Sequence, residues 1–388
     1  MKKGSFLRKT VDYLNLKDIG LLEIVFALTP ILSGYGIGGL PLSLLMWILL
    51  IFIVALQGNL KKTPLFGPLL VFVVYWVAHK MVVVFTDNVN LNGVIAQLVY
   101  FSAVFILFPN LDGKKVRGCF NWVALISIIG LLYQWSIIAR GGMIHPLEIP
   151  GLKMSESRLL SESIRPSSFF MEPAAYVEFM LFPLFLSLVD KKRLWTMIIV
   201  LSIFLTTSTT GIVLSFIMLG MSVFGGRVRM SSTLIVLIIG AALFYSLTHF
   251  DVFNAGIEKI QNTDIETNVR ITQGVHIVRS MDSDEILFGV PYDNAFAYCK
   301  AKGIASVAFY GDNVFMPTFW EIILLYGIVG ILLYTNIYLY LLKKNKVLLP
   351  FLICVVAMWF SGGYGVQNSF AYSTIFLLVS SRMYKEPI

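Results

Sequence analysis

The stretch "DKKRLWTMIIVLSIFLTTSTTGIVLSFIMLGMSVFGGRVR" (residues 190–229) decides how often this chain crosses a membrane. Between its basic ends lie the 31 residues 194–224, which are mostly apolar but contain the polar cluster "TTSTTG" at 206–211. As one helix they would be about 47 Å long, whereas a bilayer core is about 30 Å thick. The polar cluster therefore predicts a tight turn between two spans, so that both basic ends lie on one side of the membrane.

Composition places the rest of the chain in a membrane as well. Of the 388 residues, 57% are hydrophobic and 13% are charged, more apolar surface than a soluble domain can bury. Apolar runs long enough to cross centre on residues 20–34, 40–56, 65–85, 92–108, 119–138, 173–189, 194–207, 209–224, 232–249, 314–341, 347–361 and 367–381. The sequence predicts an all-α polytopic integral membrane protein, a single membrane domain over residues 1–388, with about 12 transmembrane helices.

With this number of spans, the basic segments fall on one side. They are Lys2, Lys3, Arg8 and Lys9, followed by 61–62, 114–117, 190–193, 227–229, 343–346 and 381–385. The positive-inside rule assigns that side to the cytoplasm, which predicts that both termini are cytoplasmic. The net charge of +8 is thereby explained by topology, and no nucleic-acid partner is required.

Two long connections then lie outside, at residues 139–172 and 250–313. The first contains Arg158 and Arg165 and ends in Glu172-Pro173. An acid followed by a proline predicts a helix start, so helix capping is the competing interpretation of Glu172, as headgroup contact is for Arg165.

The second connection contains an amphipathic stretch, "NVRITQGVHIVRS" at 268–280. Its apolar residues Ile271, Val275, Val278 and Met281 share one helical face, and arginines 270 and 279 flank that face. We expect a helix in the membrane interface that either binds anionic lipid or covers a cavity and directs one arginine inward.

Arginines on both outer loops, with a carboxylate nearby, favour a pyrophosphate ligand, because the guanidinium fork is always protonated and matches phosphate oxygens. The four histidines are scattered and no metal-binding or nucleotide-binding motif occurs. We therefore predict no metal site and no cofactor.

Three segments resemble bacterial O-antigen and capsule polymerases of the Wzy type. They are "RPSSFFMEPAAYVEF" (165–179), "NVRITQGVHIVRS" with the following "EILFGV" (285–290), and "GDNVFMPTFWEIILLYGIVG" (311–330). The resemblance covers about residues 160–335 and the topology of the whole chain.

The resemblance implies a metal-independent glycosyltransferase of GT-C-like architecture, with two long extracytoplasmic loops and an active site facing the periplasm or exterior. It would transfer a growing glycan from undecaprenyl diphosphate to a new undecaprenyl-diphosphate-linked repeat unit. A chain-length regulator protein is an implied partner, beside the lipid-linked oligosaccharide and the bilayer.

By position, the resemblance assigns the catalytic arginines to Arg270 and Arg165, with Arg279 as a weaker third. Glu172 and Asp312 are the candidate proton acceptors. The related O-antigen ligases carry histidine where this chain has Asp312 before Asn313, which disfavours a ligase. The turn reads "FGVP" at 288–291 where the family has "FGxG".

The remaining candidate residues lie nearby or inside spans. We expect substrate binding by Arg279, Arg158, Asn313, His79 and Lys80, with a structural pair between Lys80 and Glu178 as the alternative. Charged groups at membrane depth usually pair or face a cavity, and this applies also to Glu23 and Glu321.

Two other functions remain open, a ligase that moves finished glycan and a non-enzymatic flippase for the lipid-linked oligosaccharide. Without a flippase, cells retain repeat units inside. Without the polymerase they display single repeat units, and without the ligase they accumulate long chains on carrier lipid.

Overall fold

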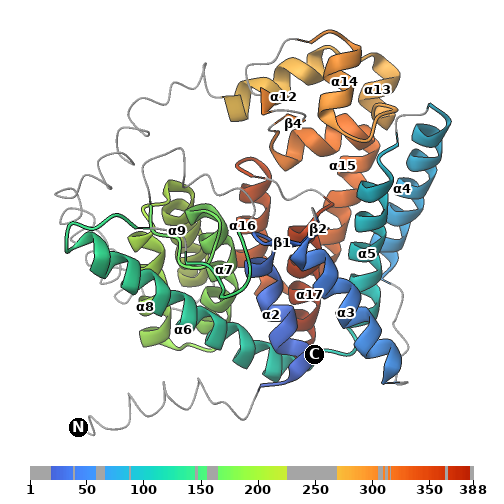
Figure 1. The fold of residues 1–388 in the computed structure, drawn as a ribbon. Coiled ribbons are helices and arrows are strands. Elements are labelled where there is room, and N and C mark those ends of the chain that lie inside the picture. Colours follow the sequence, from blue (N-terminus) through green and yellow to red (C-terminus); the bar gives the residue numbers. More distant parts are fainter. Residues whose placement is uncertain are drawn as a thin grey trace, which may run out of the picture. The chain divides into compact units, whose positions relative to one another are not determined.

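The computed structural model describes residues 19–37, 40–57, 66–86, 89–144, 147–154, 165–224, 269–304, 309–310, 313–314, 316–362 and 366–384. The chain divides into two compact units, each built from separated segments. Unit 1 comprises 1–53, 111–262 and 349–354, and unit 2 comprises 54–110, 263–348 and 355–388. Both are mostly helical (Figure 1).

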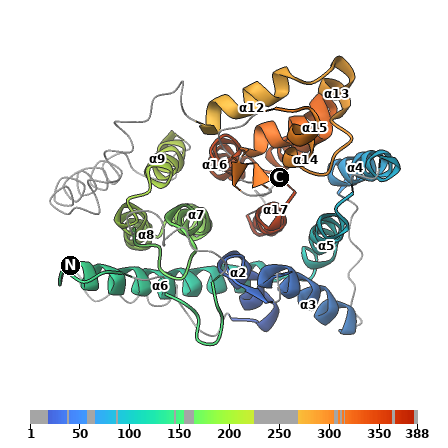
Figure 2. The same ribbon diagram turned by 45° about the horizontal axis from the view of Figure 1, so that its top comes forward.

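Unit 1 is a set of apolar helices packed side by side. Its described elements are α2 (Leu21–Leu32), β1 (Gly36–Ile37), β2 (Leu40–Pro41), most of α3 (Leu42–Leu56), α6 (Gly113–Ile138), α7 (Pro173–Val189), α8 (Arg193–Leu205) and α9 (Thr209–Phe224). Helix α7 packs against α6, α8 and α9, and α2 packs against α6 (Figure 2). Phe120 of α6 stacks on Phe179 of α7 and meets Phe26 of α2 edge-on, which closes the core of this unit.

Unit 2 joins a second set of apolar helices to a group of shorter ones. Its described elements are α4 (Gly67–Phe85), α5 (Leu91–Leu107), α12 (Val269–Arg279), α13 (Ser283–Phe288), α14 (Ala295–Ala301), β3 (Phe309–Tyr310), β4 (Asn313–Val314), α15 (Thr318–Lys344), η3 (Lys346–Leu348) and α17 (Asn368–Met383). Helix α16 (Leu349–Trp359) is divided between the two units. Helices α12, α13 and α14 gather around the first part of α15 (Figure 1).

The apolar helices confirm the coarse prediction of a helical membrane protein. Among the described residues, α4, α6 and α15 are each long and apolar enough to cross a membrane, and seven shorter apolar helices accompany them. The number of about 12 spans and the GT-C-like architecture remain predictions. The run expected at 232–249 lies outside the described residues.

The turn predicted inside the long apolar stretch is confirmed. Helix α8 ends at Leu205 and α9 begins at Thr209. Between them Thr207 adopts a left-handed backbone with φ of 56°. The polar cluster therefore separates two helices, as the length argument required.

One basic segment lies elsewhere than predicted. Residues 114–117 were expected in a loop, but they form the first turns of α6. The reason is Asp112, whose side chain caps this helix by accepting hydrogen bonds from the amides of Lys114 and Lys115. Glu23 of α2, a charge expected within a span, in turn accepts from the Asp112 amide at 3.0 Å.

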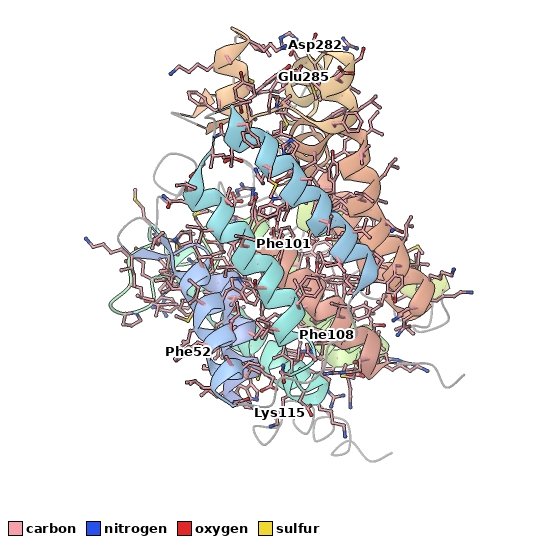
Figure 3. The ribbon with its side chains drawn as sticks, turned by 90° about the vertical axis from the view of Figure 1, so that its right-hand side faces the viewer. Phe52, Phe101, Phe108, Lys115, Asp282 and Glu285 are labelled. Atoms are coloured by element: carbon pink, nitrogen blue, oxygen red, sulfur yellow. The ribbon has the colours of Figure 1, made fainter. Side chains whose placement is uncertain are left out.

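Helix α15 is bent where the sequence suggested one uninterrupted run. Gly327 has φ of 67° and ψ of −172°, so the first nine residues of the helix and the remainder meet at a kink. Within unit 2, Tyr334 below this kink packs edge-on against Phe72 of α4. On α5, Phe101 (labelled in Figure 3) contacts the Phe72 ring as well.

Candidate functional site

The first long connection, residues 139–172, ends at a helix start, as predicted. Glu172 is the N-cap residue of α7 and Pro173 is its first helical residue. The Glu172 carboxylate makes no capping hydrogen bond to the first-turn amides, so capping by hydrogen bond does not explain this acid. Arg165 lies seven residues earlier and its side chain is half-buried.

The backbone that follows Arg165 is fixed from inside α6. Gln134 is fully buried, and its side-chain oxygen accepts hydrogen bonds from the amides of Ser167 at 3.0 Å and Ser168 at 2.8 Å. Ser168 holds a left-handed φ of 57°, and its hydroxyl occupies the space that a side chain at Gly130 would fill. The turn therefore packs directly against α6 at Gly130, where the helix has no side chain.

Sequence reasoning missed Gln134. Its signal was present, because it is an amide within the apolar run 119–138. A buried polar side chain requires hydrogen-bond partners, and here those partners are the two turn amides.

Tyr35 joins two parts of the connection 139–172, near residues 147–149 and at residue 169. Its buried hydroxyl lies 3.2 Å from the Leu147 carbonyl oxygen, 3.3 Å from the Phe169 carbonyl oxygen and 3.3 Å from the Ile149 amide. Burial raises the pKa of this hydroxyl, so it stays protonated and can donate to a carbonyl. The segment before α7 is thus anchored at two points, Gln134 and Tyr35.

We expect Tyr35→Phe to destabilise unit 1 by about 1–3 kcal/mol, because a part-buried carbonyl loses its donor and the Ile149 amide loses its acceptor. Tyr133 is exposed and offers the matched control, Tyr133→Phe. Thermal unfolding in detergent, with amide exchange over residues 147–154 and 165–172, would measure the effect. Equal stability and exchange in the two variants would contradict an anchoring role.

In the second long connection, residues 250–313, the predicted helix exists, but its most buried residues are shifted from the predicted face. Helix α12 buries Gln273, Gly274 and Ile277, whereas Val275 and Val278 are only half-buried. Met281, just beyond the end of α12, is buried as predicted. Within the helix the burial is shifted toward Gly274, which lies so close to the ring of Trp320 that a Cβ at position 274 would overlap it. Helix packing, and not the apolar stripe alone, sets the orientation.

The arginines of α12 fall at its two ends. Arg279 is exposed in the last turn. Arg270 lies in the first turn, and its side chain is outside the described residues. Whether either faces a ligand stays a prediction.

Helix α4 holds the segment after α13 through buried polar side chains. His79 donates from Nε2 to the Val290 carbonyl oxygen at 3.1 Å. Lys80 forms an ion pair with Asp293, and both side chains are almost fully buried, at 7% and 5% exposure. Asp293 also accepts a hydrogen bond from the Asn90 amide.

These contacts contradict one pairing proposed for Lys80 and identify Asp293 as its partner. The carboxylate partner of Lys80 is Asp293, so the suggested pair with Glu178 is wrong. Sequence reasoning missed Asp293, although an acid shortly after "FGVP" was visible. His79 and Lys80 are occupied by the protein's own chain, and their substrate-binding role stays a prediction.

Two glycines interlock α13 with the kink of α15. Gly289 (φ 90°) and Gly327 (φ 67°) each lie so close to the other segment that a Cβ would overlap its backbone, at the Leu325 carbonyl and the Leu287 carbonyl respectively. The Tyr75 hydroxyl is shared by the carbonyls preceding the two glycines, at 2.9 Å from Phe288 and 2.7 Å from Tyr326. The backbones of "LFG" (287–289) and "LYG" (325–327) are thus in direct contact, with no room for a side chain between them.

Polar contacts close the group formed by α12, α13 and α14. Asp282 and Glu285 lie together at the start of α13 (Figure 3), where they form a capping box. Lys302 pairs with both acids, and the Tyr298 hydroxyl lies 3.1 Å from the Glu285 carboxylate. Burial raises the pKa of Tyr298, with the Glu285 charge adding to it.

The other predicted site residues are only partly described. Arg158 and Asp312 lie outside the described residues. The backbone of Asn313 forms part of β4, and its side chain is outside the described part of the structure. Glu321 is half-buried in the first turn of α15.

The comparisons leave the chain without an assigned family. Within the part of the chain that the structure describes, no group of three or more His, Cys, Asp or Glu side chains could hold a metal ion. Neither the family models nor the curated proteins with which the chain was compared include a match.

Proposed function

We propose that this chain is a polysaccharide polymerase of a bacterial plasma membrane. It transfers a growing glycan from undecaprenyl diphosphate to a new undecaprenyl-diphosphate-linked repeat unit on the outer face. Three motifs in the order of the Wzy-type polymerases support the proposal, as do the apolar helices and the fixed turn beside Arg165. About 12 spans and a GT-C-like architecture belong to it.

The observation that carries the proposal is the locked backbone after Arg165. The backbone amides of Ser167 and Ser168 both donate to the side-chain oxygen of Gln134, a buried residue of α6. A cationic donor whose backbone is already in place needs little reorganisation when negative charge develops on a leaving group. Arginine suits a diphosphate because its planar fork donates two parallel hydrogen bonds and keeps its charge at any physiological pH.

The proposed step is a displacement at the anomeric carbon of the donor glycan. The acceptor hydroxyl oxygen forms the new glycosidic bond, and the bond from that carbon to the diphosphate oxygen breaks. The electron pair leaves with undecaprenyl diphosphate, whose growing charge Arg165 stabilises. The hydroxyl proton passes to a carboxylate, for which Glu172 and Asp312 are the candidates.

We assign Arg270 the corresponding role in the second outer segment. It lies on α12, whose orientation is fixed by the contact between Gly274 and Trp320. A rigid helix places an arginine at lower entropic cost than a free loop does. Arg279, on the same helix, is the weaker third candidate.

Reconstitution tests the function directly. The purified chain in liposomes, given only a lipid-linked repeat unit, should produce a ladder of longer lipid-linked glycans. Nucleotide and metal should be unnecessary. A ligase would transfer finished glycan to another acceptor without a ladder, and a flippase would move repeat units across the liposome membrane without forming new bonds.

In this assay we expect Arg165→Ala to lower the rate by ~10²–10³, the usual effect of losing one donor to a developing charge. Arg165→Lys should recover part of the loss, because the charge remains while the fork does not. Arg140, exposed near the start of the same segment, supplies the control Arg140→Ala. Normal polymerisation by Arg165→Ala, with folding intact, would remove Arg165 from the mechanism.

A further inference from the structure

The segment after α12 lies beside the middle of two apolar helices. Phe288 bonds through its carbonyl to Tyr75, the ninth residue of the 19-residue α4. At 1.5 Å per residue, Tyr75 lies about 15 Å from the end of α4 at Phe85. The same hydroxyl reaches Tyr326, about 12 Å from the start of α15. If α4 crosses a bilayer along its length, Phe288 lies at the depth of the hydrocarbon.

Backbone at that depth must have its polar groups satisfied, because lipid offers no hydrogen bonds. Three carbonyls at the end of α13 and just after it have such partners, from α4 and from the residue that follows it. The Phe288, Val290 and Pro291 carbonyls accept from Tyr75, His79 and Thr86 respectively.

Backbone carbonyls next to the kink of α15 also accept hydrogen bonds from this region. The Val290 amide donates to the Leu324 carbonyl oxygen at 2.9 Å. The Tyr326 carbonyl, next to the kinked Gly327, accepts from Tyr75. The polar side chains of α4 therefore have a physical reason to lie within an apolar helix: they donate hydrogen bonds to non-helical backbone that water does not reach.

The side chains at the end of α13 continue an apolar surface. Leu287 is 44% exposed and Phe288 is 56% exposed. Beside Tyr75, the exposed residues of α4 at helical spacing are Val71, Val74, Ala78 and Val82, a face that suits acyl chains. The first turn of α13 is different, because Asp282 and Asp284 are charged and exposed.

We propose that residues 283–291 form a re-entrant segment that dips into the bilayer, with Leu287 and Phe288 against lipid acyl chains. The polar first turn of α13, about 7.5 Å from Phe288 along the helix, lies nearer the membrane surface, and the chain returns along α4 to the ion pair of Asp293 with Lys80. The occupant of this surface is the hydrocarbon of the bilayer, because the surface continues the exposed apolar face of α4. The inference is independent of the chemistry proposed above.

Depth-dependent quenching tests this placement. Phe288→Cys and the control Asp284→Cys would each carry a fluorescent label in the full chain, reconstituted in liposomes. The native cysteines at 119, 299 and 354 are buried, and the unsubstituted chain measures any background labelling. We expect nitroxides at mid-chain of the lipid to quench position 288 several-fold more than aqueous iodide does, with the reverse at position 284. Equal iodide quenching at both positions would overturn the proposal.

A second measurement uses the unaltered chain. Photolysis of a phospholipid with a diazirine in its acyl chain should label the peptide containing residues 286–290. The peptide containing the exposed Arg279 should remain unlabelled and serves as the internal control. Absence of label from 286–290, with other lipid-facing peptides of the same sample labelled, would overturn the proposal.

Discussion

Replacing Gly327 with alanine is expected to lower the stability of unit 2 by on the order of 3 kcal/mol or more. Two costs combine: the backbone at φ 67° and ψ −172° lies in a region essentially restricted to glycine, which costs other residues about 1–3 kcal/mol, and overpacking typically adds about 1–3 kcal/mol. The second cost arises because the new methyl would overlap the Leu287 backbone. Unfolding in mixed micelles and amide exchange over residues 283–293 would measure the loss.

Two control glycines separate these costs. Gly303 also has a positive φ of 65°, but nothing lies within 4 Å of its Cβ position, so Gly303→Ala should show a positive-φ backbone cost without any overlap. Gly67 has neither feature, and Gly67→Ala should change stability by less than about 0.5 kcal/mol. If Gly327→Ala were no worse than Gly303→Ala, the interlock of α13 with α15 would be wrong.

The second large effect is expected at the buried ion pair. Lys80→Met should destabilise unit 2 by about 3–5 kcal/mol, because it leaves the Asp293 carboxylate buried without a counter-charge. Accelerated amide exchange over residues 288–294 and a lower unfolding midpoint would show it.

The double variant Lys80→Met/Asp293→Asn provides the decisive comparison. It removes both charges, while the side-chain oxygen of the new asparagine can still accept from the Asn90 amide, so most of the stability should return. Lys346→Met, at an exposed lysine of the same unit, should have little effect. Additive losses in the double-variant cycle would show that the two residues do not act as a pair.

The sequence alone determined the features that depend on local pattern. Long apolar runs indicated helices in a membrane, "TTSTTG" indicated the break between α8 and α9, and Glu172-Pro173 marked the start of α7. Each follows from hydrophobic period, helix length or backbone preference within a few residues, and these act without knowledge of distant partners.

Only the tertiary structure decided which polar side chains meet. Tyr75 and Phe288 are separated by 213 positions, and so are Lys80 and Asp293. The buried face of α12 was likewise set by one ring, Trp320, on another helix. A helical period shows that a face will be buried but not what will cover it, because close packing between distant segments depends on shapes that no local pattern contains.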